Sequence, residues 1–277
     1  MKEMTQRDIQ LVGLDIMKDI HRFCVENEIR YSLAYGSLIG AIRHNGFIPW
    51  DDDIDIWMPR PDYERFCKTY QSQEGYKLIS PYKDDNYFYF TKVYDDKRTH
   101  VEMKWRHLNG DLGVWIDVYP IDGVSDDRIV LYNDFSQICQ IRRKINSIRI
   151  SYTQICKNSG LKKARAIFYK YAKRICYGSL NSLRSKHEML CMNYVFGQTK
   201  HCSSLCCVDA YKKKKPECFD TSDFSEYLLS DFETEKFYIT ASYDHILKSI
   251  YGDYMVIPPK EQQVSHLTKD GEHFYWK

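Results

Sequence analysis

The protein has 277 residues, of which 43% are hydrophobic and 28% are charged, a composition typical of a globular chain of one or two domains. Forty Lys and Arg residues against thirty-eight Asp and Glu residues leave a formal charge of +2, less than proteins that coat nucleic acid usually carry. No apolar run approaches the ~18 residues of a membrane span, and the first ten residues lack an apolar signal core. We therefore expect a cytoplasmic protein that does not bind nucleic acid.

The N-terminal part of the chain predicts short helices and strands in alternation. Residues 5–28 place apolar side chains at intervals of three and four, and Thr5 and Asp8 have the spacing of a capping box, which predicts an amphipathic helix. The elements expected after it are a strand over 31–34, a tight turn at 36–37, a helix over 38–43, a strand over 53–58 and a helix over 62–70.

Residues 76–122 predict further strands and turns, with 91–99 and 113–123 as the ordered pieces. In the second piece Val114, Ile116 and Val118 alternate with polar or aromatic residues. Because successive side chains of a strand point to opposite faces, Asp117 is expected on the face away from the core.

Residues 135–187 differ from the rest of the chain, because they hold thirteen Lys and Arg residues and no Asp or Glu. Their pattern is helical and contains few helix breakers. Such a segment is typical of a solvated helix face, and it also suits contact with nucleotide phosphates or with an anionic membrane surface.

Ten cysteines occur without a signal peptide, so we expect reduced thiols, several of them in the core. His201, Cys202, Cys206 and Cys207 form a cluster, but no CxxC pair is present. We favour buried thiols over a zinc site here.

The chemistry concentrates on aspartates. Asp53 and Asp55 lie two residues apart on an expected strand, so both carboxylates point to one side and repel each other unless a cation lies between them. Mg²⁺ suits such a pair, and Asp117 is placed to complete a triad of carboxylates. Gly36 and Ser37 form a turn that leads into a helix, where backbone N–H groups bind phosphate. Together these residues favour phosphoryl transfer, although an acidic loop or a helix cap is the alternative for the aspartates alone.

These motifs resemble a known family. Gly36-Ser37 followed by Asp53-Ile54-Asp55-Ile56 is similar to the signature of the nucleotidyltransferase superfamily, and residues 36–66 resemble the LicD family of phosphotransferases. The resemblance continues through 91–99, 115–123 and 251–259. It implies transfer of a phospho-alcohol, most often phosphocholine, from a CDP-linked donor to a sugar hydroxyl of a cell-surface glycan.

The resemblance also implies roles for single residues. Asp53, Asp55 and Asp117 match the catalytic and metal-binding carboxylates, with Mg²⁺ as the expected ion and Mn²⁺ as the alternative. The positions expected to bind a CDP-choline or other CDP-alcohol donor are Gly36, Ser37, Arg43, His44, Asp52 and Lys92. In the implied mechanism Asp117 binds a second metal or accepts the proton of the attacking hydroxyl.

Tyr35 departs from the family pattern, which often has glycine there, and its ring is expected to narrow the donor pocket. A quaternary ammonium binds over aromatic faces, and Trp57 and residues 87–90 (Tyr-Phe-Tyr-Phe) are candidates for that contact.

The expected fold is α/β (α+β): a small mixed sheet of nucleotidyltransferase type flanked by helices, with a basic helical insertion. We expect a catalytic core over 1–134, the insertion over 135–215, and a C-terminal segment over 216–277 that packs on the core. The expected partners are the CDP-alcohol, a glycan acceptor that is free or lipid-linked, and the inner face of an anionic membrane. A metal-dependent glycosyltransferase and a nucleotidyltransferase that releases pyrophosphate are the alternative functions.

Overall fold

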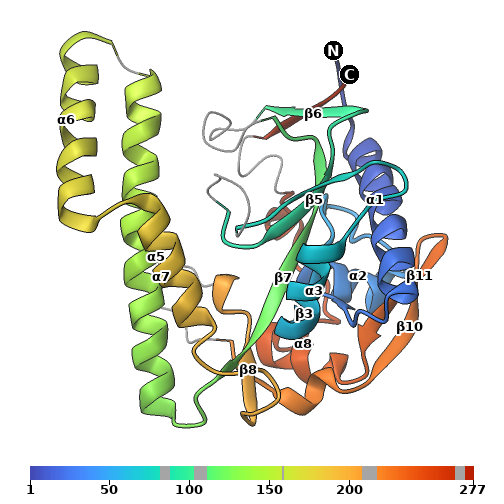
Figure 1. The fold of residues 1–277 in the computed structure, drawn as a ribbon. Helices are drawn as coiled ribbons and strands as arrows, with labels where there is room; N and C mark the ends of the chain where they lie inside the picture. Colours follow the sequence, from blue (N-terminus) through green and yellow to red (C-terminus); the bar gives the residue numbers. More distant parts are fainter. Residues whose placement is uncertain (82–87, 103–110, 158, 208–216, 266–271) are drawn as a thin grey trace. The chain divides into compact units, whose positions relative to one another are not determined.

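The computed structural model describes residues 1–81, 88–102, 111–157, 159–207, 217–265 and 272–277 (Figure 1). The chain forms two compact units, one made of residues 1–121 with 219–277 and the other of residues 122–218. The expected insertion, 135–215, lies within the second unit, and the expected boundary at 215/216 falls outside the described residues.

The first unit is built on a mixed sheet, which confirms the predicted fold class. Its strands lie in the order β2 (Ser32–Leu33), β3 (Asp55–Pro59), β7 (Val114–Val124), β5 (Thr91–Asp95) and β4 (Lys77–Ile79). β3 and β7 run parallel, and the other neighbours in this order are antiparallel. The central position of β7, between β3 and β5, brings side chains from three distant segments onto one face.

Helices cover this sheet. α1 (Gln6–Glu26) contacts β5, while α2 (Tyr35–His44) and α3 (Arg60–Thr69) both contact β3. Thr5 caps α1 in a capping box with Asp8, as its sequence predicts. A further helix of this unit, α8 (Tyr243–Tyr251), contacts α2.

Smaller elements complete the first unit. β1 (Lys2–Glu3), β12 (His273–Trp276) and β6 (Thr99–Glu102) form a separate antiparallel sheet. β10 (Tyr227–Phe232) and β11 (Glu235–Thr240) form a hairpin. The short elements left are β9 (Phe219–Asp220) and the 3₁₀ turns η2 (Thr221–Phe224) and η3 (Lys260–Gln262).

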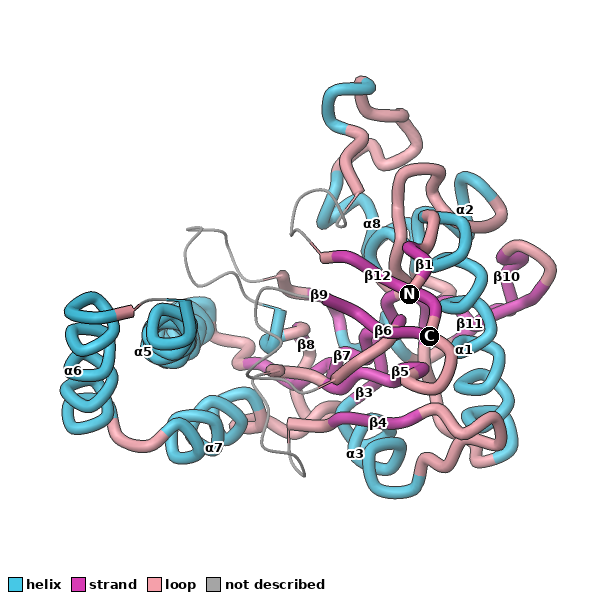
Figure 2. The backbone as a smooth tube through the Cα atoms, turned by 90° about the horizontal axis from the view of Figure 1, so that it is seen from above, coloured by secondary structure: helices cyan, strands magenta, loops and turns pink. Residues whose placement is uncertain are grey.

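The second unit is mainly helical. α5 (Arg128–Lys157) packs against both α6 (Gly160–Tyr177) and α7 (Leu180–Cys191), and the three helices are seen from above in Figure 2. β8 (His201–Ser203) pairs with the last three residues of β7, and η1 (Leu205–Cys207) follows it. Among the helices of the described residues, none combines the length and the apolar character needed to cross a membrane.

The cysteine cluster of this unit is partly buried, with His201 and Cys207 half-exposed. Cys202 and Cys206 are buried, and the imidazole of His201 is 2.9 Å from the carboxylate of Asp126. These contacts agree with the preference for buried thiols.

The predicted turn at 36–37 belongs to a helix, because α2 begins already at Tyr35. Tyr35 enters α2 with φ +46° and Asn45 ends it with φ +52°. Backbone with positive φ suits glycine or asparagine and strains other residues. Tyr35 thus adopts a conformation that glycine would adopt without strain.

A matched pair of helical glycines tests the packing of α2. In Gly40→Ala the new Cβ would meet the backbone oxygen of Gly46, which cannot easily move, whereas in Gly13→Ala it would meet only Ile54 Cδ1 at 3.9 Å. We expect Gly40→Ala to lower the free energy of unfolding by about 1–3 kcal/mol, and Gly13→Ala to raise it by about 0.5–1 kcal/mol because alanine is the better helix former. Urea unfolding measures both, and equal stability of the two variants would contradict the assigned packing.

Candidate active site

Two carboxylates and one ammonium form a row across three neighbouring strands. Asp55 on β3 is paired with Asp117 on β7, and Asp117 is also paired with Lys92 on β5. Paired residues on adjacent strands place their side chains on the same face. Lys92 Nζ forms an ion pair with Asp117, both side chains are almost fully buried, and the Tyr119 hydroxyl donates to Asp117 Oδ2 at 3.3 Å.

Two more carboxylates approach this row from the loop that precedes β3. Asp51 shares a side-chain hydrogen bond with Asp53, and the charge of Asp53 acts on Asp51, Asp55 and Asp117. Four acidic groups therefore lie close enough to perturb one another. Asp51 was not among the residues that the sequence singles out for catalysis, although it begins the run of three aspartates before the strand.

Burial and repulsion raise the pKa values of Asp51, Asp55 and Asp117. Burial first, and the charge of Asp53 second, raise the pKa of Asp51 from 3.8 to about 8. The pKa of Asp55 is raised well above its ordinary value by burial and by Asp53 and Asp117. Burial also raises the pKa of Asp117, and the ammonium of Lys92 opposes that change. Buried carboxylates held together in this way gain stability from a cation.

The donor atoms of these residues are of the type that a hard divalent cation binds. Asp55 Oδ1 is buried and has no hydrogen-bond partner in the protein, so one buried acceptor still needs a positive group. Carboxylate oxygens are the ligands that Mg²⁺ and Mn²⁺ prefer. Asp53 and Asp55, with Asp117 beside them, are the residues that would hold such an ion.

The N-terminus of α2 lies next to these carboxylates. The Asp51 carboxylate occupies the space in which a Cβ on Gly36 would stand, and Ser37 Oγ accepts a hydrogen bond of 2.9 Å from the Asp55 backbone N–H. Ala34 provides no side-chain cap, so α2 begins without a protein acceptor from that residue. The positive end of the helix dipole thus faces the acidic site, where it favours phosphate oxygens.

Helix α1 holds the acidic loop in place. The side-chain amide of Gln10 donates to the Asp51 carbonyl at 2.7 Å, and that of Gln6 donates to the same oxygen at 3.0 Å. Arg7 donates to Gln10 and to Glu233, and Glu233 accepts from the Phe47 N–H. The loop before β3 is therefore anchored at both ends by contacts to α1 and to the β10–β11 turn, none of which its sequence indicates.

Three more residues that were expected to bind the donor lie close to the acidic loop in sequence: Arg43 and His44 in the last turn of α2, and Asp52 in the loop before β3. Arg43 donates to the carbonyls of Tyr254 and Val256 and, through Nε, to His44 Nε2. Burial lowers the pKa of Arg43, and burial together with Arg43 lowers the pKa of His44. Asp52 is buried. The structure thus joins Arg43 to the C-terminal segment 251–259 that shares the family pattern.

An aromatic row runs beside the ionic row on the same face. The register pairs Trp57 on β3 with Tyr119 on β7, and Phe90 lies opposite Tyr119 with ring centres 4.4 Å apart. The Tyr35 ring stands nearly at right angles to Tyr119, at 87° and 5.7 Å, and covers Trp57 at 4.7 Å. Since same-face positions of a strand are about 6–7 Å apart, these rings adjoin the carboxylates.

The ammonium group of Lys92 lies among three aromatic rings near this row. Its Nζ lies 4.4 Å from the Trp115 ring centre, 5.0 Å from that of Phe88 and 5.1 Å from that of Phe90. Of the other aromatic candidates, Trp57 and Tyr89 are buried, and Tyr87 lies outside the described residues. Tyr35, Tyr119 and Phe90 are partly exposed.

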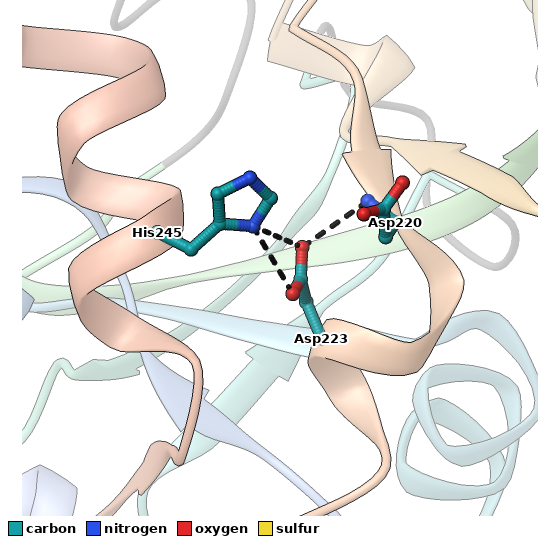
Figure 3. A group of neighbouring side chains, drawn as sticks. All are labelled: Asp220, Asp223 and His245. Carbon is teal, nitrogen blue, oxygen red and sulfur yellow. Dashed lines mark hydrogen bonds and ion pairs between the residues drawn. The ribbon is translucent and has the colours of Figure 1, made fainter.

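A second group of metal-ligand types lies elsewhere in the first unit. Figure 3 shows Asp220, Asp223 and His245, whose ligand atoms lie within 4.8 Å of one another. Asp223 accepts from the Asp220 backbone N–H at 3.1 Å in the capping box of η2, and His245 Nδ1 is 3.2 Å from it. These bonds satisfy Asp223 without an ion, so we assign the group to the capping of η2.

Comparison with known proteins agrees with this geometry. Residues 28–145 match the family model described as LicD/FKTN/FKRP, nucleotidyltransferase domain. The chain contains a LicD-family domain. The matched segment holds the whole acidic cluster, the N-terminus of α2 and Lys92.

Individual relatives extend over different lengths of the chain. The lipopolysaccharide cholinephosphotransferase LicD of Haemophilus influenzae is 28% identical over 277 aligned residues, which cover 98% of each chain. The human ribitol 5-phosphate transferase FKRP is 33% identical over 97 residues, which are 35% of this chain and 18% of FKRP. The first likeness thus includes the helical unit, and the second is limited to part of the protein.

The raised pKa of Asp51 predicts a pH-dependent stability in metal-free protein. Between 3.8 and about 8 the folded state retains a proton that the unfolded chain has lost. The free energy of unfolding should therefore fall as the pH rises through this range, by up to roughly 1.4 kcal/mol per pH unit.

Thermal melts in a chelator across this pH range test the sign, with Asp51→Asn expected to flatten the dependence and the exposed control Asp231→Asn expected to leave it unchanged. Added Mg²⁺ should raise the melting temperature most at the alkaline end, where the carboxylates are ionised. A stability that rises with pH in the metal-free protein would contradict the assignment.

Proposed function

We propose that the protein is a Mg²⁺-dependent phosphotransferase that moves phosphocholine from CDP-choline to a sugar hydroxyl of a cell-surface polysaccharide or lipid-linked glycan and releases CMP. The observation that carries the proposal is the row of Asp55, Asp117 and Lys92 beside the N-terminus of α2, in which Asp117 and Lys92 are buried. The LicD-family domain and the full-length likeness to a cholinephosphotransferase support it.

Each part of the site has a role in this reaction. Asp53 and Asp55 would hold the divalent ion, which when bound neutralises charge on the donor pyrophosphate. The first turn of α2 binds donor oxygens through backbone N–H groups at Gly36 and Ser37. Because Ser37 Oγ accepts from the Asp55 N–H, its own hydroxyl hydrogen remains to donate to the donor.

The transfer forms one bond and breaks one. The acceptor oxygen attacks the phosphorus that bears choline, the bond from this phosphorus to the bridging oxygen breaks, and CMP leaves with that electron pair. Asp117 accepts the proton of the acceptor hydroxyl, a role that suits a carboxylate whose pKa is raised by burial. Lys92 positions Asp117 through their ion pair rather than binding the pyrophosphate.

The aromatic row supports choline as the transferred alcohol. Tyr35 and Tyr119 meet at nearly a right angle, and two rings in this arrangement can contact one quaternary ammonium from two sides. The adjacent rings around Lys92 already hold an ammonium group. Ribitol phosphate is the second candidate for the transferred group, because part of this chain is also similar to the ribitol 5-phosphate transferase FKRP.

A cytoplasmic location belongs to the same proposal, since CDP-linked donors and reduced cysteines suit that compartment. The glycosyltransferase and pyrophosphate-releasing alternatives would give a nucleoside diphosphate or pyrophosphate in place of CMP.

Removal of a single carboxylate tests the reaction. We expect Asp53→Asn and Asp55→Asn to lower CMP release from CDP-choline by at least about a thousandfold while the protein stays folded, because the ion loses a ligand. The control Asp231→Asn removes an exposed carboxylate and should retain full turnover. Mass-spectrometric detection of CMP with a panel of CDP-alcohols and glycans measures this, and near-normal transfer by either variant with Mg²⁺ present would exclude the assignment.

The choline contact is tested by substitution at Tyr119. Tyr119→Leu removes the ring, so we expect KM for CDP-choline to rise about tenfold while KM for CDP-glycerol changes little. Tyr119→Phe is the matched control, because it keeps the ring and loses only the hydroxyl that donates to Asp117. Equal changes for both donors in Tyr119→Leu would show that the ring does not recognise the ammonium.

A further inference from the structure

Helix α6 carries an apolar stripe on the side that faces away from α5. Ala166 is buried and Lys173 Nζ donates to the Ser147 carbonyl of α5 at 2.9 Å, so these two positions define the inner side. Leu161, Phe168 and Ile175 repeat at intervals of seven and lie two residues, or about 200°, away from the inner positions. Their exposed fractions are 90%, 69% and 85%, and Tyr171 between them is 56% exposed.

Cations accompany this stripe. Lys162, Lys163 and Arg165 are exposed in the first two turns of α6. The helix has no Asp or Glu, and neither has the whole segment 135–187. Arg165 adjoins the stripe, four residues after Leu161 and three before Phe168, while Lys162 and Lys163 lie toward the side of Ala166 at the start of the helix. An exposed apolar stripe on a cationic helix is the pattern of a helix that lies in a membrane interface.

The positive charge of α6 indicates which partner covers this face: a second copy of the helix, water or anionic lipid. A second copy of α6 would bring cations against cations, with no acidic side chain on either helix to pair with them. Water alone would leave four large apolar side chains exposed on one line, which is rare unless they bind something. Anionic lipid accepts both parts of the face, because phosphate groups attract the cations and acyl chains cover the apolar stripe.

We propose that the face of α6 formed by Leu161, Phe168, Tyr171 and Ile175 docks on an anionic lipid surface, with Arg165 beside this face at the headgroups and Lys162 and Lys163 adding positive charge at the exposed start of the helix. The biological role of this docking rests on the proposed function, since docking would hold the enzyme where a lipid-linked glycan acceptor lies. The contact itself depends only on the chemistry of α6.

Vesicle sedimentation with paired variants tests the docking. The probe is vesicles of equimolar phosphatidylglycerol and phosphatidylcholine at low salt, compared with phosphatidylcholine alone. We expect the wild-type protein to sediment with the anionic vesicles only. Phe168→Ser/Ile175→Ser and Lys162→Glu/Lys163→Glu should each lower its partition coefficient by at least about tenfold.

Each variant has a matched control in the same chain. Ile129→Ser/Met189→Ser removes equally exposed apolar side chains from α5 and α7, and Lys68→Glu/Lys248→Glu makes the same charge change on α3 and α8. Circular dichroism verifies that all four proteins fold. Wild-type binding by both α6 variants, equal losses in the controls, or equal binding to neutral vesicles would overturn the proposal.

Two further readouts separate the competing explanations. Sedimentation velocity that shows a dimer in the wild type and a monomer in Phe168→Ser/Ile175→Ser would overturn docking in favour of self-association. Transfer to a water-soluble acceptor should be unchanged in both α6 variants. Protein that releases CMP but does not bind anionic vesicles overturns the docking alone, while protein that binds vesicles and releases no CMP overturns the proposed function alone.

Discussion

The repulsion between closely placed carboxylates is the constraint on which the rest of this site depends. Asp55 and Asp117 are neighbours on the parallel strands β3 and β7, and Asp51 and Asp53 approach them from the preceding loop. Charges of one sign in a poorly solvated place destabilise a fold unless positive groups face them. The ion pair with Lys92 and the N-terminus of α2 supply part of that compensation, and the unpaired oxygen of Asp55 marks where a cation would supply the rest.

The scaffold holds these groups with backbone contacts that do not titrate. Asp117 and Lys92 lie on central strands, the Asp55 N–H is bound by Ser37, and the Asp51 carbonyl is bound by two glutamines of α1. Rigid elements of this kind keep the carboxylates close together, although their repulsion lowers the stability of the folded protein. Active sites commonly reduce the stability of a fold in this way. The same strands continue into the aromatic row, so the carboxylates and the aromatic rings share one sheet register.

The formal charge of +2 is an average over two unlike parts. Thirteen of the forty cations lie in residues 135–187, which leaves twenty-seven against thirty-eight acids, or −11, for the remainder. The acidic remainder includes the carboxylate site, while the basic part supplies α6 and its neighbours. A protein so divided suits phosphate-rich substrates in one unit and an anionic surface in the other.

Local periodicity alone determined much of this protein: the capping box of α1, the alternation that puts Asp117 on the face opposite Ile116 and Val118, the mixed α/β class and the basic helices all depend on residues close in sequence. The expectation that Asp117 faces away from the core was wrong, because other elements cover that face as well and bury its side chain. Only the tertiary structure placed Asp51 over Gly36, paired Lys92 with Asp117, put Tyr35 in a left-handed conformation and buried Trp57 beneath it. Lys92 and Asp117 are twenty-five residues apart, and Asp51 lies fifteen residues beyond Gly36. Spacings within one strand or helix are set by backbone geometry, whereas contacts between elements depend on strand register and helix packing, which no local pattern encodes.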